Sequence, residues 1–205
     1  MPHLKLVFKI LFVFLLLNNI SSANEVAGLK IDAQSFSCIR DMTKVRGLYV
    51  GNLLGKNAAT LTVANSATGG KYPAGSVVQL VPTEVMVKQP KGFNAASQDW
   101  EFFELEVSKT GTVIKKRGTT DVVNRFGGNC LGCHIKAKPQ WDLVCETGHG
   151  CDPLPLTKDM LSFIQKTDPR CETNGVLSEQ EKMAAAQLQQ MMAASATKKK
   201  AAVSK

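Results

Sequence analysis

The chain has 205 residues, of which 44% are hydrophobic and 20% are charged, so it has enough apolar residues for a packed core and is not disordered as a whole. The formal net charge is +8, but six of the 25 basic residues lie close to the chain ends: Lys5, Lys9, Lys198, Lys199, Lys200 and Lys205. Without them, 19 basic residues face 17 acidic ones, a balance of about +2. A nearly neutral body argues against a nucleic-acid-binding domain.

Residues 1–23 have the features of a secretory signal peptide. Two lysines precede an uninterrupted apolar run at 10–17, and Ser21 and Ala23 occupy the −3 and −1 positions of a small-residue cleavage site. The run is far shorter than the roughly 20 apolar residues that span a bilayer. We therefore expect cleavage after Ala23 and an exported protein, periplasmic or secreted, that has no membrane partner after cleavage.

The next segment, 24–46, is of mixed composition, with a short helix expected near 37–45. Short β-prone runs then follow from Gly47, and Gly- and Pro-containing turn signals separate them. Short strands with short connections predict a mainly antiparallel sheet in an α+β fold with flanking N- and C-terminal helices. The predicted strands are 48–50, 60–63, 77–81, 84–87, 100–107 and 112–114.

The β-prone pattern ends after Gly118. Residues 126–156 are rich in Gly, Cys and Pro and are expected to form loops around a site. A short helix is expected at 157–165, with an inward-facing stripe of Met160, Leu161 and Ile164. Ser178 and Glu181 have capping-box spacing, which predicts a helix to about Met192 followed by a basic, solvated tail. The chain thus divides into a main domain, 47–175, and a C-terminal helix with a tail, 176–205.

The motif that carries chemistry is Cys130-Leu131-Gly132-Cys133-His134, the Cys-x-x-Cys-His attachment pattern of c-type haem. The two thiols can form thioether bonds with the two haem vinyl groups, and the following imidazole can ligate the iron. An export signal agrees with this assignment because bacterial c-type attachment occurs outside the cytoplasm. The sequence predicts one covalent haem c, bound by Cys130, Cys133 and His134, with His134 as the proximal iron ligand.

Two alternatives to haem attachment are a zinc or structural disulfide site and a thiol redox pair. A thioredoxin-like pair follows a buried strand and begins a helix within a βαβ pattern, but residues 124–129 have no such pattern. A zinc site needs further ligands at paired spacing, and export disfavours free thiolates.

The remaining four cysteines are even in number, which suggests two disulfides in an exported chain, with three ways to pair them. The four residues are Cys38, Cys145, Cys151 and Cys171. A Cys145–Cys151 bond would close a small loop, and a Cys38–Cys171 bond would tie the N-terminal segment to the C-terminal helices.

The second axial position of the iron decides between a pure electron carrier and a ligand-binding site. His149 is either a distal ligand or proton donor, or a loop histidine held near the surface by a disulfide, and we favour the loop. Met42, Met86 and Met160 are candidate ligands that fit core positions equally well. We favour an open or water-occupied position over methionine ligation.

The chain resembles the cytochrome P460 family, which includes the β-type cytochromes c′. The resemblance consists of Tyr-Pro-Ala-Gly-Ser-Val-Val at 72–78, Asp-Trp-Glu-Phe-Phe at 99–103, the haem motif, and Trp-Asp-Leu-Val at 141–144. It implies a P460-like, mainly antiparallel β fold with flanking helices over 47–175. It also implies one c-type haem ligated by the motif histidine, an open distal pocket and, in many members, a homodimer.

The family contains two functional types. P460 members carry a lysine that cross-links to the haem and supports hydroxylamine oxidation, but this chain has Gln79 and Leu80 at about that place. Lys71 and Lys88 are nearby but out of register. The β-type cytochromes c′ lack the cross-link, bind NO and CO, and cap the distal face with aromatic side chains. Trp100, Phe102 and Phe103 could form such a cap, or they could be core residues of the sheet.

Together, these features predict an exported monohaem c-type cytochrome that exchanges electrons with a redox partner protein, binds a small ligand such as NO or CO, or does both. The alternatives are a P460-type enzyme that oxidises hydroxylamine or NO, and a disulfide-stapled binding module without haem. No nucleic-acid partner is expected.

Overall fold

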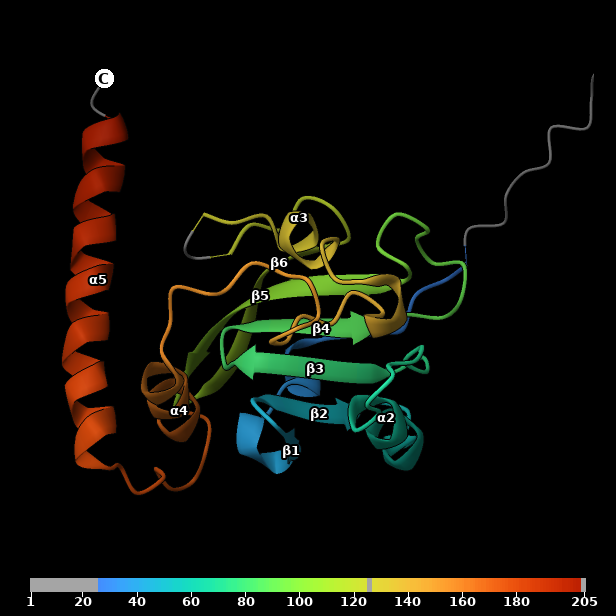
Figure 1. The fold of residues 1–205 in the computed structure, drawn as a ribbon, viewed down its shortest axis with the longest axis horizontal. Helices are drawn as coiled ribbons and strands as arrows, with labels where there is room; N and C mark the ends of the chain where they lie inside the picture. The colour runs from blue at the N-terminus through green and yellow to red at the C-terminus, as the bar shows by residue number, and fades with distance from the viewer. Residues whose placement is uncertain (1–25, 125–126, 204–205) are drawn as a thin grey trace, which may run out of the picture.

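The computed structural model describes residues 26–124 and 127–203, and for 194–203 it describes the backbone alone. The predicted signal peptide therefore lies outside the described residues. Within them, a six-stranded antiparallel sheet is combined with four α-helices (Figure 1). This arrangement confirms the predicted α+β class with a mainly antiparallel sheet and helices in the terminal regions.

The sheet is a meander in which every strand pairs with its neighbour in sequence, in the order β1 to β6. Three of its five connections, 46–47, 82–83 and 109–110, are only two residues long, which is the length that favours tight hairpins. The strands are β1 (Thr43–Val45), β2 (Leu48–Asn52), β3 (Ser76–Val81), β4 (Glu84–Lys88), β5 (Trp100–Ser108) and β6 (Gly111–Gly118).

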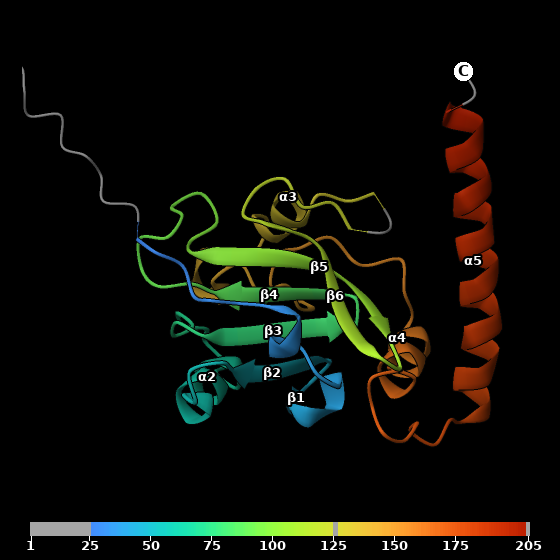
Figure 2. The ribbon, with the colours of Figure 1, turned by 180° about the vertical axis from the view of Figure 1, so that it is seen from behind.

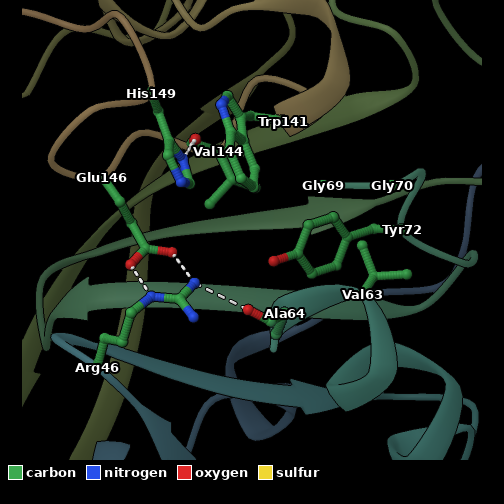
Figure 3. Close-up of a pocket in the computed structure, with 10 residues that line it drawn as sticks. All are labelled: Arg46, Val63, Ala64, Gly69, Gly70, Tyr72, Trp141, Val144, Glu146 and His149. Atoms are coloured by element: carbon green, nitrogen blue, oxygen red, sulfur yellow. Dashed lines mark hydrogen bonds and ion pairs between the residues drawn. The ribbon is translucent and has the colours of Figure 1, made fainter. Parts of the chain in front are cut away.

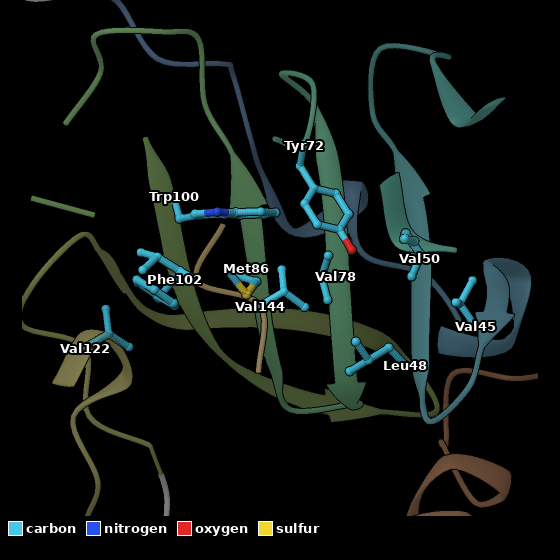
Figure 4. Close-up of a cluster of buried hydrophobic side chains, with 12 residues drawn as sticks. Val45, Leu48, Val50, Tyr72, Val78, Met86, Trp100, Phe102, Val122 and Val144 are labelled. Atoms are coloured by element: carbon cyan, nitrogen blue, oxygen red, sulfur yellow. The ribbon is translucent and has the colours of Figure 1, made fainter. Parts of the chain in front are cut away.

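Both faces of the sheet are covered by apolar clusters because successive strand side chains point to opposite sides. The front cluster lies on the face seen in Figure 1 and is drawn in Figure 4. It consists of Val45, Leu48, Val50, Ala64, Tyr72, Val78, Met86, Trp100, Phe102, Val122, Leu143 and Val144. The rear cluster consists of Ile31, Phe36, Val77, Val85, Val87, Phe103 and Leu105.

Different parts of the chain cover the two faces. The N-terminal segment that begins at Val26 crosses the rear face, which Figure 2 shows in blue. The short helix α3 (Cys130–His134) and the loops that follow it lie over the front face (Figure 1). The predicted loop region after β6 is therefore confirmed, apart from α3 and the single 3-10 turn Pro139–Trp141.

The predicted strand at 60–63 is wrong, because these residues belong to the helix α2 (Asn57–Ala64). Their β-branched side chains suggested a strand, but tertiary contacts decide the conformation. Thr60 is fully buried, and its hydroxyl lies 2.8 Å from the Ser76 hydroxyl of β3 and accepts a hydrogen bond from the Asn52 amide of β2. The helix expected near 37–45 is instead a 3-10 turn, Ile39–Asp41, followed by β1.

The predicted C-terminal helices are confirmed, with one difference in length. Helix α4 (Lys158–Lys166) begins after the N-cap Thr157, and α5 (Glu179–Val203) begins at the predicted capping box, in which Glu181 N–H bonds Ser178 Oγ. Helix α5 continues past the expected end near Met192, because Ala and Lys favour helix and the segment contains no Gly or Pro. It packs on α4 and stands away from the sheet (Figure 1).

Two disulfides connect the cysteines outside the motif. They are Cys145–Cys151, which closes a small loop, and Cys38–Cys171, which joins the N-terminal segment to the C-terminal helices. This is the pairing considered from the sequence. Among the described residues, no helix combines the length and the apolar character needed to cross a bilayer. The disulfides agree with an oxidising compartment.

Candidate functional site

The Cys-x-x-Cys-His motif forms the whole of helix α3, and Asn129 fixes its first turn. The Asn129 side chain accepts a hydrogen bond from Gly132 N–H at 2.7 Å, as an N-cap residue does, and donates one to the Thr120 carbonyl at 2.8 Å. Because residues three apart on a helix are neighbours on its surface, Cys130 and Cys133 lie on the same side of α3.

The two motif cysteines are free thiols, unlike the other four cysteines. Cys130 is half-buried and packs against the front cluster, whereas Cys133 is exposed. Burial, reinforced by the nearby Glu84 carboxylate, raises the pKa of Cys130 to about 12. Cys130 is therefore a neutral thiol at physiological pH, whereas thiol redox chemistry requires a thiolate.

His134 has its Nδ1 atom 2.7 Å from the Leu143 carbonyl oxygen. A carbonyl can only accept a hydrogen bond, so Nδ1 carries the proton and donates, and the neutral ring keeps its lone pair on Nε2. Burial lowers the pKa of His134 and outweighs the opposing effect of the Leu143 bond, which favours the neutral form. Metal-ligating histidines have this arrangement, in which one nitrogen donates to the protein and the other faces the metal.

A fully buried carboxylate, Asp142, lies next to the residue that bonds His134. It accepts a bond from Lys88 Nζ at 2.8 Å and from Lys71 Nζ at 3.1 Å. Burial lowers the pKa of Lys88, and the hydrogen bond to Asp142 opposes that effect. The two lysines closest in sequence to the family's cross-linking position are therefore both bonded to one carboxylate.

Of the three aromatic residues considered as a distal cap, Trp100 and Phe102 lie in the front cluster and Phe103 lies in the rear cluster. The Phe102 ring centroid lies 5.2 Å from that of His134, so Phe102 contacts the proposed proximal ligand itself. Trp100 is fully buried and donates its Nε1–H to the Asp142 carbonyl at 2.7 Å. Phe103 points to the rear face, where it contacts Phe36 at 5.2 Å between centroids. Figure 4 shows Trp100 and Phe102 in the front cluster.

His149 lies in the loop closed by the Cys145–Cys151 disulfide, as predicted, but it is buried rather than near the surface, with 7% of its area exposed. Its ring stacks on Trp141 at 3.8 Å, and its Nδ1 bonds the Val144 carbonyl at 2.7 Å. It lines a cavity of about 10 Å³ beside Tyr72 and the Arg46–Glu146 ion pair (Figure 3). Such a volume is the size of one water molecule.

The candidate methionine ligands occupy three separate places. Met86 is buried in the front cluster, Met42 packs against the rear cluster, and Met160 is buried in α4. They therefore do not converge on His134 as a group, and each has the core role that the sequence also allowed.

The motif does not form a closed zinc site with other described residues. Among all the residues that the structure describes, one group of three potential ligands has donor atoms within 4.8 Å of one another. It lies away from the motif and consists of Cys38, Asp168 and Cys171. Two of these are joined in a disulfide, so they offer no thiolate. The residues that sequence reasoning missed are Asp142 and Leu143, whose only signal was their place in the Trp-Asp-Leu-Val segment at 141–144.

Comparisons of the chain with models of protein families, with curated proteins and with solved structures give no match. The resemblance to the cytochrome P460 family rests on the residues quoted for it above and stays a prediction.

Proposed function

We propose that the protein is an exported monohaem c-type cytochrome that transfers electrons, binds a small ligand such as NO or CO at its haem, or does both. One observation carries the proposal. Two free thiols one helical turn apart lie next to a histidine whose Nδ1–H is already bonded to the Leu143 carbonyl, so its Nε2 is available to a metal.

The residues present fit a covalently bound haem. Each of Cys130 and Cys133 would add its S–H across one vinyl double bond, which forms a carbon–sulfur bond and needs no oxidant. His134 would be the proximal ligand, and the apolar Leu131 and Ile135 beside the thiols offer contact to a porphyrin. When bound, the haem supplies a one-electron redox centre and a coordination position for small ligands.

The state of the thiols supports haem over the other functions of the motif. The raised pKa of Cys130 disfavours the thiolate that a redox pair needs. Cys130 and Cys133 are free thiols, whereas both other cysteine pairs form disulfides. This difference supports a role for the two motif thiols other than a structural disulfide.

The environment of the lysines supports a cytochrome over a hydroxylamine-oxidising enzyme. A cross-link requires a lysine whose amino group is free to react at the haem. Lys88 is buried and held by Asp142, and Gln79, near the family's lysine position, is itself buried with its amide donating to the Pro82 carbonyl.

The proposed compartment is the periplasm or the exterior of the cell, where c-type haem attachment and disulfide formation both take place. The two disulfides and the signal-like residues 1–23 support it. A redox partner protein and a homodimer belong to the same proposal.

The test is to express the full chain in bacteria that mature c-type haem and to weigh the purified protein. We expect the mass of one haem per chain, with loss of covalent attachment in Cys130→Ala and in Cys133→Ala. The matched control, Cys145→Ala with Cys151→Ala, removes two cysteines outside the motif and should keep the haem. A reference c-type cytochrome, expressed in the same cells, shows that haem maturation works. If the reference gains its haem and the wild-type chain shows no mass increment, the proposal is refuted.

The ferrous absorption spectrum with and without CO then separates the subtypes. An ordinary c-type spectrum that changes on CO addition indicates an open distal position and ligand binding, whereas a spectrum indifferent to CO indicates a pure electron carrier. A ferrous Soret band shifted far to the red indicates a lysine-modified haem and would favour the oxidising enzyme.

A further inference from the structure

The turn that presents the Leu143 carbonyl to His134 has an unusual backbone. Asp142 and Leu143 have consecutive positive φ angles of 49° and 64°. Residues with a Cβ seldom adopt this left-handed region, and two in succession persist only where the surroundings hold them in place. The turn directly follows the 3-10 turn Pro139–Trp141 and lies within the front cluster.

Asp142 is held by hydrogen bonds to its side chain and to its backbone carbonyl. Its carboxylate accepts hydrogen bonds from Tyr72 N–H at 2.9 Å and from Lys88 Nζ at 2.8 Å. Its carbonyl accepts the Trp100 Nε1–H at 2.7 Å. The Asp142 side chain has no exposed area and that of Lys88 has 9%, so the ion pair lies away from bulk water and is screened little.

These contacts restrain the peptide unit next to the one that bonds His134. Four donors, two from the segment before β3 and one each from β4 and β5, converge on Asp142 and restrain its backbone. Because Leu143 follows directly, these contacts restrict where its carbonyl can point, and Val144 N–H, in the same peptide unit as that carbonyl, donates to the Trp141 carbonyl at 2.8 Å. The front face of the sheet thus contacts His134 in two ways, through Asp142 and Leu143 and directly through the ring of Phe102.

We propose that Asp142 is a positioning residue for His134, acting with Lys88 and Trp100 to aim the Leu143 carbonyl at Nδ1 and so to keep Nε2 unprotonated and directed to the haem iron. The inference rests on the proposed haem function for its purpose, but the geometry it describes concerns only side chains of this chain. A firmly held Nδ1–H bond makes the imidazole a stronger donor to a metal.

The test compares Asp142→Asn with Asp168→Asn. Asp168 is a matched control, because it is also a fully buried carboxylate that pairs with a buried cation, Arg170, and accepts backbone N–H bonds, from Ile39 and Arg170. Both substitutions remove one buried charge and should lower stability, but only the first disturbs the Leu143 turn. The milder variant Trp100→Phe removes the Nε1–H and keeps an aromatic ring, in case Asp142→Asn does not fold.

The first readout is the tautomer of His134, measured from the ring nitrogen shifts by NMR in the full chain produced without haem maturation. We expect the Nδ1–H form in the wild type and in Asp168→Asn. In Asp142→Asn, and more weakly in Trp100→Phe, we expect a large fraction of the Nε2–H form. This readout does not depend on haem, so it decides the inference even if the proposed function fails.

The second readout is the iron–histidine stretching band of the ferrous protein by resonance Raman spectroscopy, with the reduction potential, in the haem-loaded chain. We expect the band to move to lower frequency and the potential to rise in Asp142→Asn, because a weaker Nδ1–H bond leaves a poorer donor to ferric iron. A wild-type tautomer and a wild-type band in Asp142→Asn and in Trp100→Phe would overturn the inference, as would equal changes in Asp168→Asn.

Discussion

The two disulfides close chain segments of very different length, which makes their contributions to stability separable. Cys38 and Cys171 are 133 residues apart in sequence, whereas Cys145 and Cys151 are 6 apart. In the chain-entropy description, a crosslink stabilises the fold by restricting the unfolded chain, and the effect grows with the logarithm of the closed length. The long closure is then worth about 5 kcal/mol at 25 °C and the short one about 2 kcal/mol.

The assay is urea unfolding of the oxidised protein and of two double variants, Cys38→Ala with Cys171→Ala and Cys145→Ala with Cys151→Ala. We expect the first to lose about 3 kcal/mol more of the free energy of unfolding than the second. Since small domains are stable by roughly 5–15 kcal/mol, the loss of the long closure should remove between about a third and all of the free energy of unfolding. Equal losses, or a larger loss from the short loop, would refute the reasoning.

Three further results are expected. Asn129→Ala removes the N-cap of α3 and should cost about 1 kcal/mol in urea unfolding and lower the yield of attached haem, whereas no change in either would contradict the capping role. Bonds from Lys166, Ser162 and Ser178 N–H lower the pKa of Glu181 to about 2. Stability from Glu181 is therefore present above its ordinary pKa and lost as the pH falls from there toward about 2. Acid titration by circular dichroism should show this loss, and Glu181→Gln should flatten it. Burial raises the pKa of Tyr49, and raises that of Tyr72 to about 12, so an absorbance titration of these two tyrosines should show little phenolate at pH values near the ordinary pKa of 10, and early ionisation would contradict the burial.

The sheet and the motif could be predicted from the sequence because both depend on local patterns. Turn signals bounded the strands, and the capping box located the start of α5. The strand predicted at 60–63 failed because Thr60 is placed by hydrogen bonds with β2 and β3, which no local pattern reveals. The positions of the aromatic residues considered as a cap follow from strand alternation, which is a local pattern. Phe102 and Phe103 are adjacent in sequence, so strand alternation sends them to opposite faces.

The role of Asp142 was hidden for a different reason. Nothing in the sequence indicates that an acidic residue eight positions after a motif histidine is fully buried, or that lysines at 71 and 88 meet it. Such a residue becomes visible only when contacts between segments far apart in the chain are known. The candidate ligand set was therefore predictable, and the residues that support it were not.

The meander has a consequence for the order of assembly. Each strand pairs with the one synthesised just before it, and three of the hairpins close over two residues, so pairing can follow the order of the chain. Helix α3 comes after β6, at a point where all six strands are already available. The topology thus allows all six strands to pair before α3 packs against the front face.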